Sequence, residues 1–131
     1  MRAVAVPSLR VRARVLRHLR TYFAHERTRD FNAALRELCR FYQLPRPRVV
    51  WFERLGHSNG ATFHGFCTEG GTLELIHPEN WKRKRKYKTE AYWIKVVLHE
   101  FGHYVLWSHS GRVTIEHKAD RFRDAILKGV A

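Results

Sequence analysis

Acidic residues are scarce in this 131-residue chain, where 12 Asp and Glu stand against 25 Lys and Arg and leave a formal net charge of +13 at pH 7. So basic a balance favours nucleic acid, anionic surfaces or acidic proteins as partners. Only two cysteines occur, Cys39 and Cys67, and they do not form a Cys-x-x-Cys pair. Neither a zinc knuckle nor a redox motif is therefore indicated, and we expect reduced, buried thiols.

Long hydrophobic runs are absent as well. No apolar run approaches the ~18 residues that a membrane-spanning helix needs. The N-terminal residues carry arginines where a secretory signal needs an uninterrupted apolar core, so we expect a cytoplasmic protein. An apolar fraction of 44% is typical of a globular fold. The length predicts one domain over 1–131, with a basic N-terminal helix within 1–28.

The densest group of chemically active residues is His99, Glu100 and His103, in the order H-E-x-x-H. On a helix, a spacing of four residues puts two side chains on one face, so both imidazoles can reach the same metal ion. The preceding run, 92–98, is apolar around most of its circumference and predicts a helix in the centre of a domain. Burying two histidines and a glutamate there is costly without partners, and a metal supplies them.

The pattern predicts a catalytic zinc site with one Zn²⁺ per chain. Neutral imidazoles suit zinc, and a catalytic zinc has three protein ligands and one position for water. A carboxylate beside that water can act as general base, which is the role we expect for Glu100. An oxyanion donor is also required. Four residues are candidates that the sequence does not separate: Tyr104, His109, His117 and Arg123.

Two candidates for the third ligand lie downstream. Glu116 and Asp120 are four residues apart in an amphipathic segment, and Glu-x-x-x-Asp after H-E-x-x-H resembles the gluzincin arrangement. There the glutamate binds zinc and the aspartate orients a ligating histidine through its other ring nitrogen. The alternative is His109, ten residues after His99, as in H-E-x-x-H-x-x-G-x-x-H. That pattern has glycine where this chain has Leu106, which weakens the His109 alternative.

The segment H-E-F-G-H, followed by E-x-x-A-D-x-F from Glu116 to Phe122, resembles the ImmA/IrrE type of small metallopeptidase. Gly102 occupies the glycine position of that family. The resemblance implies a zincin-like fold, zinc bound by His99, His103 and Glu116, and Glu100 as catalytic base. Members often act on repressors or regulate stress responses.

Elsewhere, helical spacing of apolar residues predicts a helix from Ser8, as its cap, to about His25, a second from Thr28 or Asp30 to Tyr42, and a last one from Thr114. Strands are predicted over 48–54, 61–67 and 72–76 by β-branched and aromatic content and by the turns between them. We therefore expect an α+β, zincin-like fold: a small three-stranded antiparallel sheet packed against helices, with the H-E-x-x-H helix followed by a C-terminal helix.

The second predicted strand is the candidate for substrate binding, because a cleft-edge strand can pair with a peptide through free backbone groups. Its residues are Ala61, Thr62, Phe63, His64, Gly65 and Phe66. A basic run between Trp81 and Lys88 offers phosphate contacts beside aromatic stacking faces, as single-strand binders do. The candidates for nucleic-acid contact are Lys82, Arg83, Lys84, Arg85, Lys86 and Lys88. A solvated loop and, for the arginines of the first helix, a solvated helix face are the alternatives.

The sequence thus predicts a zinc metallopeptidase that hydrolyses peptide bonds, acting on a protein or peptide. One alternative is a DNA-associated protease similar to the SprT or Spartan type, with His109 as ligand and the basic patches on DNA. Another is a non-catalytic, zinc-stabilised regulatory protein that binds nucleic acid.

Overall fold

The structure is a computed structural model, and it describes residues 5–52, 56–58, 61–63, 65–68, 71–76, 89–111 and 116–130. The described residues are mainly helical. The helices are α1 (Leu9–His25), α2 (Thr28–Tyr42), α4 (Glu90–Ser110) and α5 (Glu116–Leu127). The strands have three or four residues each: β1 (Val49–Phe52), β2 (Gly56–Ser58), β3 (Ala61–Phe63), β4 (Gly65–Cys67) and β5 (Leu73–Ile76).

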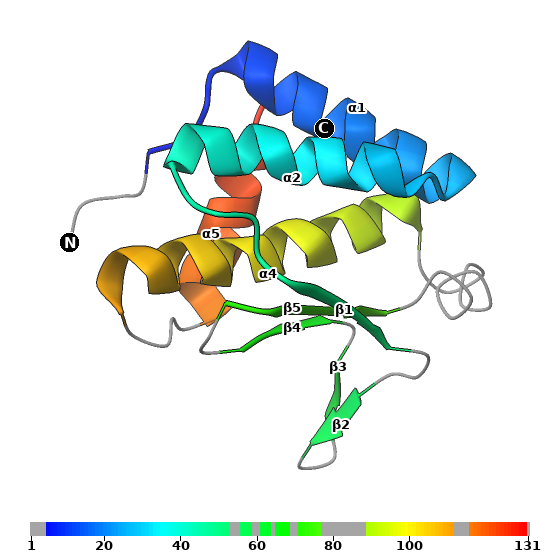
Figure 1. The fold of residues 1–131 in the computed structure, drawn as a ribbon, viewed down its shortest axis with the longest axis vertical. Helices are drawn as coiled ribbons and strands as arrows, with labels where there is room; N and C mark the ends of the chain where they lie inside the picture. The colour runs from blue at the N-terminus through cyan, green and yellow to red at the C-terminus, as the bar shows by residue number, and fades with distance from the viewer. Residues whose placement is uncertain are drawn as a thin grey trace.

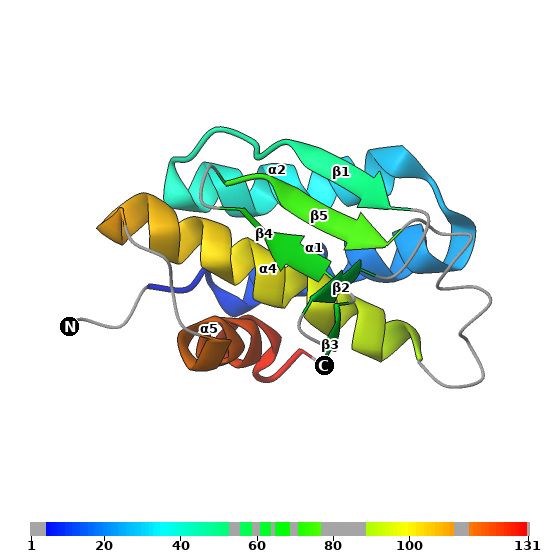
Figure 2. The same ribbon diagram turned by 90° about the horizontal axis from the view of Figure 1, so that it is seen from below.

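The described strands form a three-stranded sheet in the order β1-β5-β4 and a separate two-stranded pair, β2-β3. β1 runs parallel to β5, with Val49 opposite Leu73, and β4 runs antiparallel to β5, with Gly65 opposite Leu75. All four helices lie on one side of the three-stranded sheet, and the β2-β3 pair projects from its other side (Figure 1). α4 crosses the middle of the molecule, between the sheet and α1 (Figures 1 and 2).

The predicted fold class, an α+β zincin-like fold with a three-stranded antiparallel sheet, is wrong. The described chain is mainly helical, and β1 and β5 pair in parallel. The stretch 61–67, predicted as one strand, forms two short strands with different partners, because β3 pairs with β2 and β4 pairs with β5. The predicted hairpin of the last two strands is present as β4-β5.

The helix boundaries follow from local chemistry. The Ser8 hydroxyl accepts a hydrogen bond from the Val11 N–H and begins α1, as expected from the sequence. α2 ends before Leu44 and the two prolines, as predicted. Two large apolar residues of these helices are exposed, Leu9 of α1 by 54% and Phe41 of α2 by 40%.

Buried apolar side chains from all four described helices and from β5 form one hydrophobic cluster, and Cys67 of β4 packs against it. Aromatic rings connect its parts, since Phe31 and Tyr22 both pack against Trp51 of β1. At the other side of the cluster, Phe122 of α5 lies against Phe101 of α4 and Tyr42 of α2. This cluster holds α4 and α5 side by side, which positions the site.

Candidate metal centre

α4 carries the H-E-x-x-H residues, and its sequence explains both its ends and its burial. The Thr89 hydroxyl accepts a hydrogen bond from the Tyr92 N–H, and Gly111 ends the helix in the left-handed conformation at φ 69°. Threonine and glycine are residue types favoured at these two positions. Nine of its residues are buried, so polar side chains in its middle need partners.

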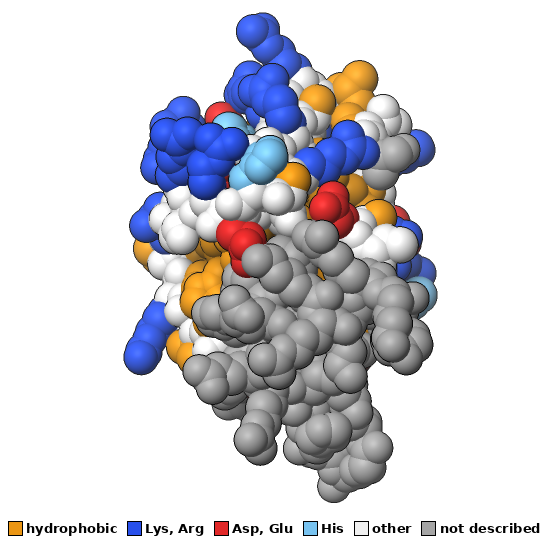
Figure 3. Space-filling view, turned by 90° about the vertical axis from the view of Figure 1, so that its right-hand side faces the viewer, with side chains coloured by type: hydrophobic (Ala, Val, Ile, Leu, Met, Phe, Trp, Pro, Cys, Tyr) orange, Lys and Arg blue, Asp and Glu red, His pale blue; other side chains and the backbone are white. Residues whose placement is uncertain are grey.

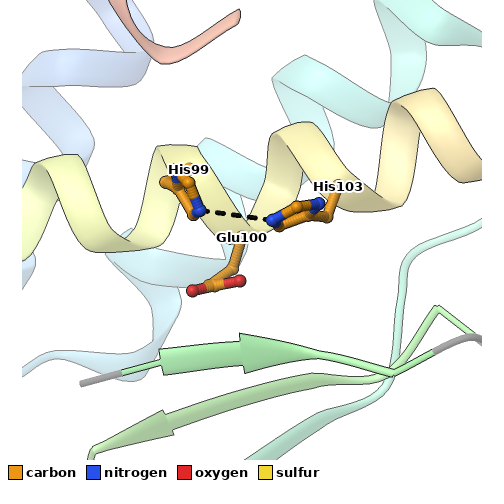
Figure 4. Close-up of side chains that lie close together, drawn as sticks. All are labelled: His99, Glu100 and His103. Carbon is orange, nitrogen blue, oxygen red and sulfur yellow. Dashed lines mark hydrogen bonds between the residues drawn. The ribbon is translucent and has the colours of Figure 1, made fainter. Parts of the chain in front are cut away.

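His99 and His103 lie one turn apart on the same side of α4. Their Nε2 atoms are 3.2 Å apart and each side chain is 12% exposed. Figure 4 shows both rings on one side of the helix, whereas the Glu100 side chain points towards the strands. One ligand atom from each of these three residues lies within 4.8 Å of the other two, a spacing that a metal ion could bridge.

Glu116, the first residue of α5, reaches both histidines. Its Oε2 lies 2.5 Å from His99 Nε2, and its Oε1 lies 3.1 Å from His103 Nε2. Its side chain is 78% exposed, so the group opens to solvent on the α5 side. Two imidazole nitrogens and a carboxylate from separate helices therefore converge on one point.

Asp120 lies one turn further along α5 and contacts the other ring nitrogen of His99. Its Oδ1 is 2.8 Å from His99 Nδ1, and the same oxygen accepts a hydrogen bond of 2.9 Å from Arg123 Nη1. A carboxylate at Nδ1 holds the proton of a neutral imidazole there. The lone pair of His99 is then on Nε2, the atom that faces Glu116 and His103.

This arrangement fits a bound cation. Without one, the Nε2 lone pair of a neutral His99 faces the Glu116 carboxylate, and two acceptors repel each other at 2.5 Å. Zinc bonds of about 2.0–2.1 Å to nitrogen in a tetrahedral site imply ligand atoms about 3.3 Å apart. The separations of His103 Nε2 from His99 Nε2 and Glu116 Oε1, 3.2 and 3.1 Å, are close to that value. Two imidazoles and a carboxylate also match the donor set of catalytic zinc.

Burial sets the protonation of two of these residues. It is the main cause that lowers the pKa of His103 below its usual value, partly opposed by the negative charge of Glu116. A neutral imidazole is the form that binds metal. Glu100 is 7% exposed, and its pKa rises from 4.5 to about 8 through burial first, then through repulsion by Glu116 and Asp120. A nearby cation would reverse that repulsion and favour the carboxylate.

Two glycines bring the elements of the site close together. A Cβ on Gly65 of β4 would lie 2.8 Å from Val96 Cγ1 and 3.2 Å from Glu100 Oε2, so the strand passes directly beside the buried carboxylate. A Cβ on Gly102 would lie 2.9 Å from the Phe122 ring. The absence of a side chain at Gly102 therefore allows α5 to pack onto α4. Neither packing role is evident from the sequence, although Gly102 lies inside the H-E-x-x-H motif.

The structure does not bring His109 to the other candidate ligands. α4 continues unbroken to Ser110, which puts His109 about 9 Å beyond His103 along the helix axis. His109 is exposed there. Leu106, where the alternative pattern has glycine, gives the helix no break at which to turn back.

The structure places the other candidates for oxyanion stabilisation in different environments. The Tyr104 hydroxyl donates to the Pro45 carbonyl, and Arg123 is paired with Asp120 and Asp124. His117 is exposed next to Glu116.

Neither cysteine is in a disulfide: Cys39 is buried and Cys67 is partly buried. Burial raises the pKa of the Cys39 thiol to about 11 and that of the Cys67 thiol to about 12.

Several predicted residues fall outside the described ones. His64 is one, and the basic run with Lys82, Arg83, Lys84, Arg85, Lys86 and Lys88 is another. The remaining residues of the predicted substrate strand divide between β3 (Ala61, Thr62 and Phe63) and β4 (Gly65 and Phe66). Of the two strands, β4 packs against α4.

No family model, curated protein or solved structure matches this chain. None of the helices in the described part of the chain combines the length and the apolar character needed to span a membrane.

Proposed function

We propose that this protein is a zinc-dependent peptidase in which His99, His103 and Glu116 hold one zinc ion and Glu100 is the general base. A single observation carries the proposal. His99 Nε2, His103 Nε2 and the Glu116 carboxylate converge within 2.5–3.2 Å, and the buried carboxyl of Glu100 comes from the same turn of α4. Asp120 orients His99 through Nδ1.

When bound, zinc would acidify a water molecule and polarise a peptide carbonyl. The protein's own residues would do the rest. The Glu100 carboxylate takes a proton from the attacking water on one of its Oε atoms and passes it to the leaving amine. Its buried position limits competing hydrogen bonds from solvent and raises its affinity for that proton.

Substrate binding is proposed at β4. In the described sheet this strand is at an edge, with β5 on one side. The backbone of Gly65 lies directly beside the Glu100 side chain. An extended peptide that added to this edge through backbone hydrogen bonds would pass beside the catalytic carboxylate. This proposal narrows the predicted substrate segment from 61–66 to its β4 part.

The resemblance to ImmA/IrrE metallopeptidases and a cytoplasmic location remain part of the proposal. They rest on the sequence motifs and on free thiols at both cysteines. The DNA-associated protease alternative required His109 as a ligand, and the straight course of α4 argues against that.

The metal site is tested by the zinc content of purified protein, measured by mass spectrometry with Glu116→Ala and His109→Ala side by side. We expect about one zinc per chain in the wild type and in His109→Ala. Glu116→Ala should lose most of it, because two imidazoles alone leave the site one protein ligand short. Zinc retained without Glu116, or absent from the wild type, would refute the proposed ligand set.

The catalytic role is tested with Glu100→Gln, which keeps shape but cannot accept the proton. Zinc content should be unchanged, while hydrolysis of an unstructured test protein such as casein should fall by about 10²–10⁴-fold. Glu90→Gln, an exposed substitution on the same helix, is the matched control. Hydrolysis that persists in Glu100→Gln, or that is missing from zinc-loaded wild type, would leave a metal-stabilised protein without peptidase chemistry.

A further inference from the structure

Six exposed arginines lie on the two N-terminal helices, three on each. We call them the arginine face: Arg10, Arg17 and Arg20 of α1, and Arg29, Arg36 and Arg40 of α2. Both helices belong to a range that the structure describes without a gap, and that range contains no lysine. The charge of this surface is therefore carried by arginine.

Helical spacing aligns each set of three. Arg29, Arg36 and Arg40 fall within about 40° of one another around α2 at 100° per residue. On α1, the three arginines fall within about 80° by the same spacing. The exposed Ala13 lies between Arg10 and Arg17, and the exposed Ala24 follows Arg20 on the same side. Small residues on this side leave room for a partner's backbone to approach.

The buried residues occupy the opposite side of each helix, so both stripes point away from the core. α1 and α2 pack against each other along their length. In Figure 3, Lys and Arg side chains gather in the upper half of the view, which is the side of α1 and α2. Each stripe is about 15 Å long, and together they make the outer side of the α1–α2 pair basic.

The other arginines of α1 are bound within the fold. Arg12 donates to the carbonyl oxygens of Pro7, Ala125, Ile126 and Lys128. Arg14 forms an ion pair of 3.3 Å with Glu37 of α2. A sequence pattern of five similar arginines thus divides into two that stabilise the fold and three that face solvent.

The acidic side chains of α1, α2 and the turn between them do not neutralise the arginine face, and from the rest of the described chain Glu90 of α4 lines the same hollow as Arg20. The range from Ser8 to Gln43 contains three, and each is partly buried. Glu37 pairs with Arg14, and Asp30 lies 3.7 Å from Arg27. Glu26 is at the end of α1, in the turn to α2. A surface with six exposed arginines is an electrostatic site for a polyanion.

We propose that the arginine face binds the phosphate backbone of double-stranded nucleic acid. Guanidinium groups match phosphate oxygens in a bidentate geometry, which favours arginine over lysine for this contact. A duplex presents one charge per ~1.7 Å of axis, so a 15 Å surface meets enough phosphates for all six arginines. Single-strand binders stack successive bases on several aromatic rings, whereas among the Phe, Tyr and Trp residues of α1 and α2 only Phe41, next to Arg40, is exposed. The contact is to the backbone and is independent of sequence.

The test measures binding of a fluorescent 20-base-pair DNA duplex by anisotropy over a range of salt concentrations. The variants replace Arg10, Arg17 and Arg20, or Arg29, Arg36 and Arg40, by Gln. Each triple variant should weaken binding by about two orders of magnitude at 0.1 M salt and lower the slope of log K against log salt by about 2.7. The matched control replaces three exposed cations on other elements by Gln: Arg48, Arg121 and Lys128.

The control should keep most of the affinity and the slope. Triple Arg→Lys variants, which retain charge, should retain the salt slope, and circular dichroism establishes that each variant folds. Equal losses in the control and the arginine variants would overturn the proposal. So would tighter binding to single strands than to duplex, or binding only to vesicles of anionic phospholipid. The peptidase proposal is independent of this test, because Glu100→Gln should bind the duplex like the wild type.

Discussion

Of the helices that the structure describes, α4 and α1 are the longest, and they place their polar residues in opposite ways. α4 is buried on most sides, and its polar residues His99, Glu100 and His103 lie in the middle among apolar neighbours. α1 buries one stripe and exposes most of its arginines to solvent. A polar group in the middle of α4 needs a specific partner, whereas one on the exposed side of α1 is already hydrated.

The difference shows where residue type alone indicates function. In α4, burial makes each charged or titratable group energetically costly, so the convergence of Glu116 and Asp120 on the histidines explains why these residues are tolerated. In α1, five arginines look alike in the sequence, and only the contacts of Arg12 and Arg14 separate structural from free ones.

The largest expected effect concerns the buried carboxyl of Glu100 in metal-free protein. Its pKa rises from 4.5 to about 8 in the folded state, so the native protein binds more protons than the unfolded chain between these values. Stability should therefore fall as the pH rises through that window, by at most about 1.4 kcal/mol per pH unit and on the order of 4 kcal/mol in total. Urea unfolding of chelator-treated protein at several pH values measures it.

Glu100→Gln should remove this pH dependence, while Glu90→Gln, exposed at the N-terminus of α4, should keep it. Bound zinc should also reduce it, because a cation favours the Glu100 carboxylate. The same slope in wild type and Glu100→Gln would mean that burial of this group does not set the stability of α4.

The next largest effect is expected at Arg12, and it separates a structural arginine of α1 from an exposed one. Arg12→Ala removes a cation that binds the last carbonyl groups of α5, and we expect a loss of about 2–3 kcal/mol in the free energy of unfolding. Arg17→Ala, on the exposed side, should change it by less than about 0.5 kcal/mol. Denaturant unfolding of both variants measures the contrast. Similar losses in the two would contradict the division of the arginines.

Gly102 links the packing of α4 to the metal site. A methyl group there meets the Phe122 ring, so Gly102→Ala should destabilise the protein by about 1–3 kcal/mol and move Glu116 and Asp120 away from the histidines. Zinc affinity, measured by chelator competition, should fall with it. The double variant with Phe122→Leu should recover part of both, since a smaller side chain makes room. No recovery would indicate that the loss arises within α4 itself.

The sequence predicted the elements that depend on local chemistry. The ends of α1, α2 and α4 follow from Ser8, from the prolines after Leu44, and from Thr89 with Gly111. The sheet was predicted wrongly because strand direction depends on contacts distant in the sequence. Nothing local to 61–67 indicates that β3 and β4 take different partners.

The residues that meet at the candidate site could be predicted, because helical spacing places His99 with His103 and Glu116 with Asp120. The packing that brings the two helices together could not. It depends on the Phe122 ring against Gly102, and the approach of β4 depends on the absence of a side chain at Gly65. A glycine in a helix or strand can have several causes, so the sequence alone does not show that a neighbouring element packs closely against it.

The smallest expected effect tests what the two helices share. α1 and α4 have the same type of N-cap, since the hydroxyls of Ser8 and Thr89 each accept a hydrogen bond of 3.3 Å from the backbone N–H of the residue three positions later. Ser8→Ala and Thr89→Ala should each lower stability by about 1 kcal/mol, because both leave one helix N–H without its acceptor. Zinc affinity should not change in either, since His99 lies more than two turns beyond Thr89. If Thr89→Ala weakened zinc binding, the start of α4 and its metal site would be coupled. The start of the helix could then no longer be attributed to local hydrogen bonding and the metal site to tertiary packing as independent causes.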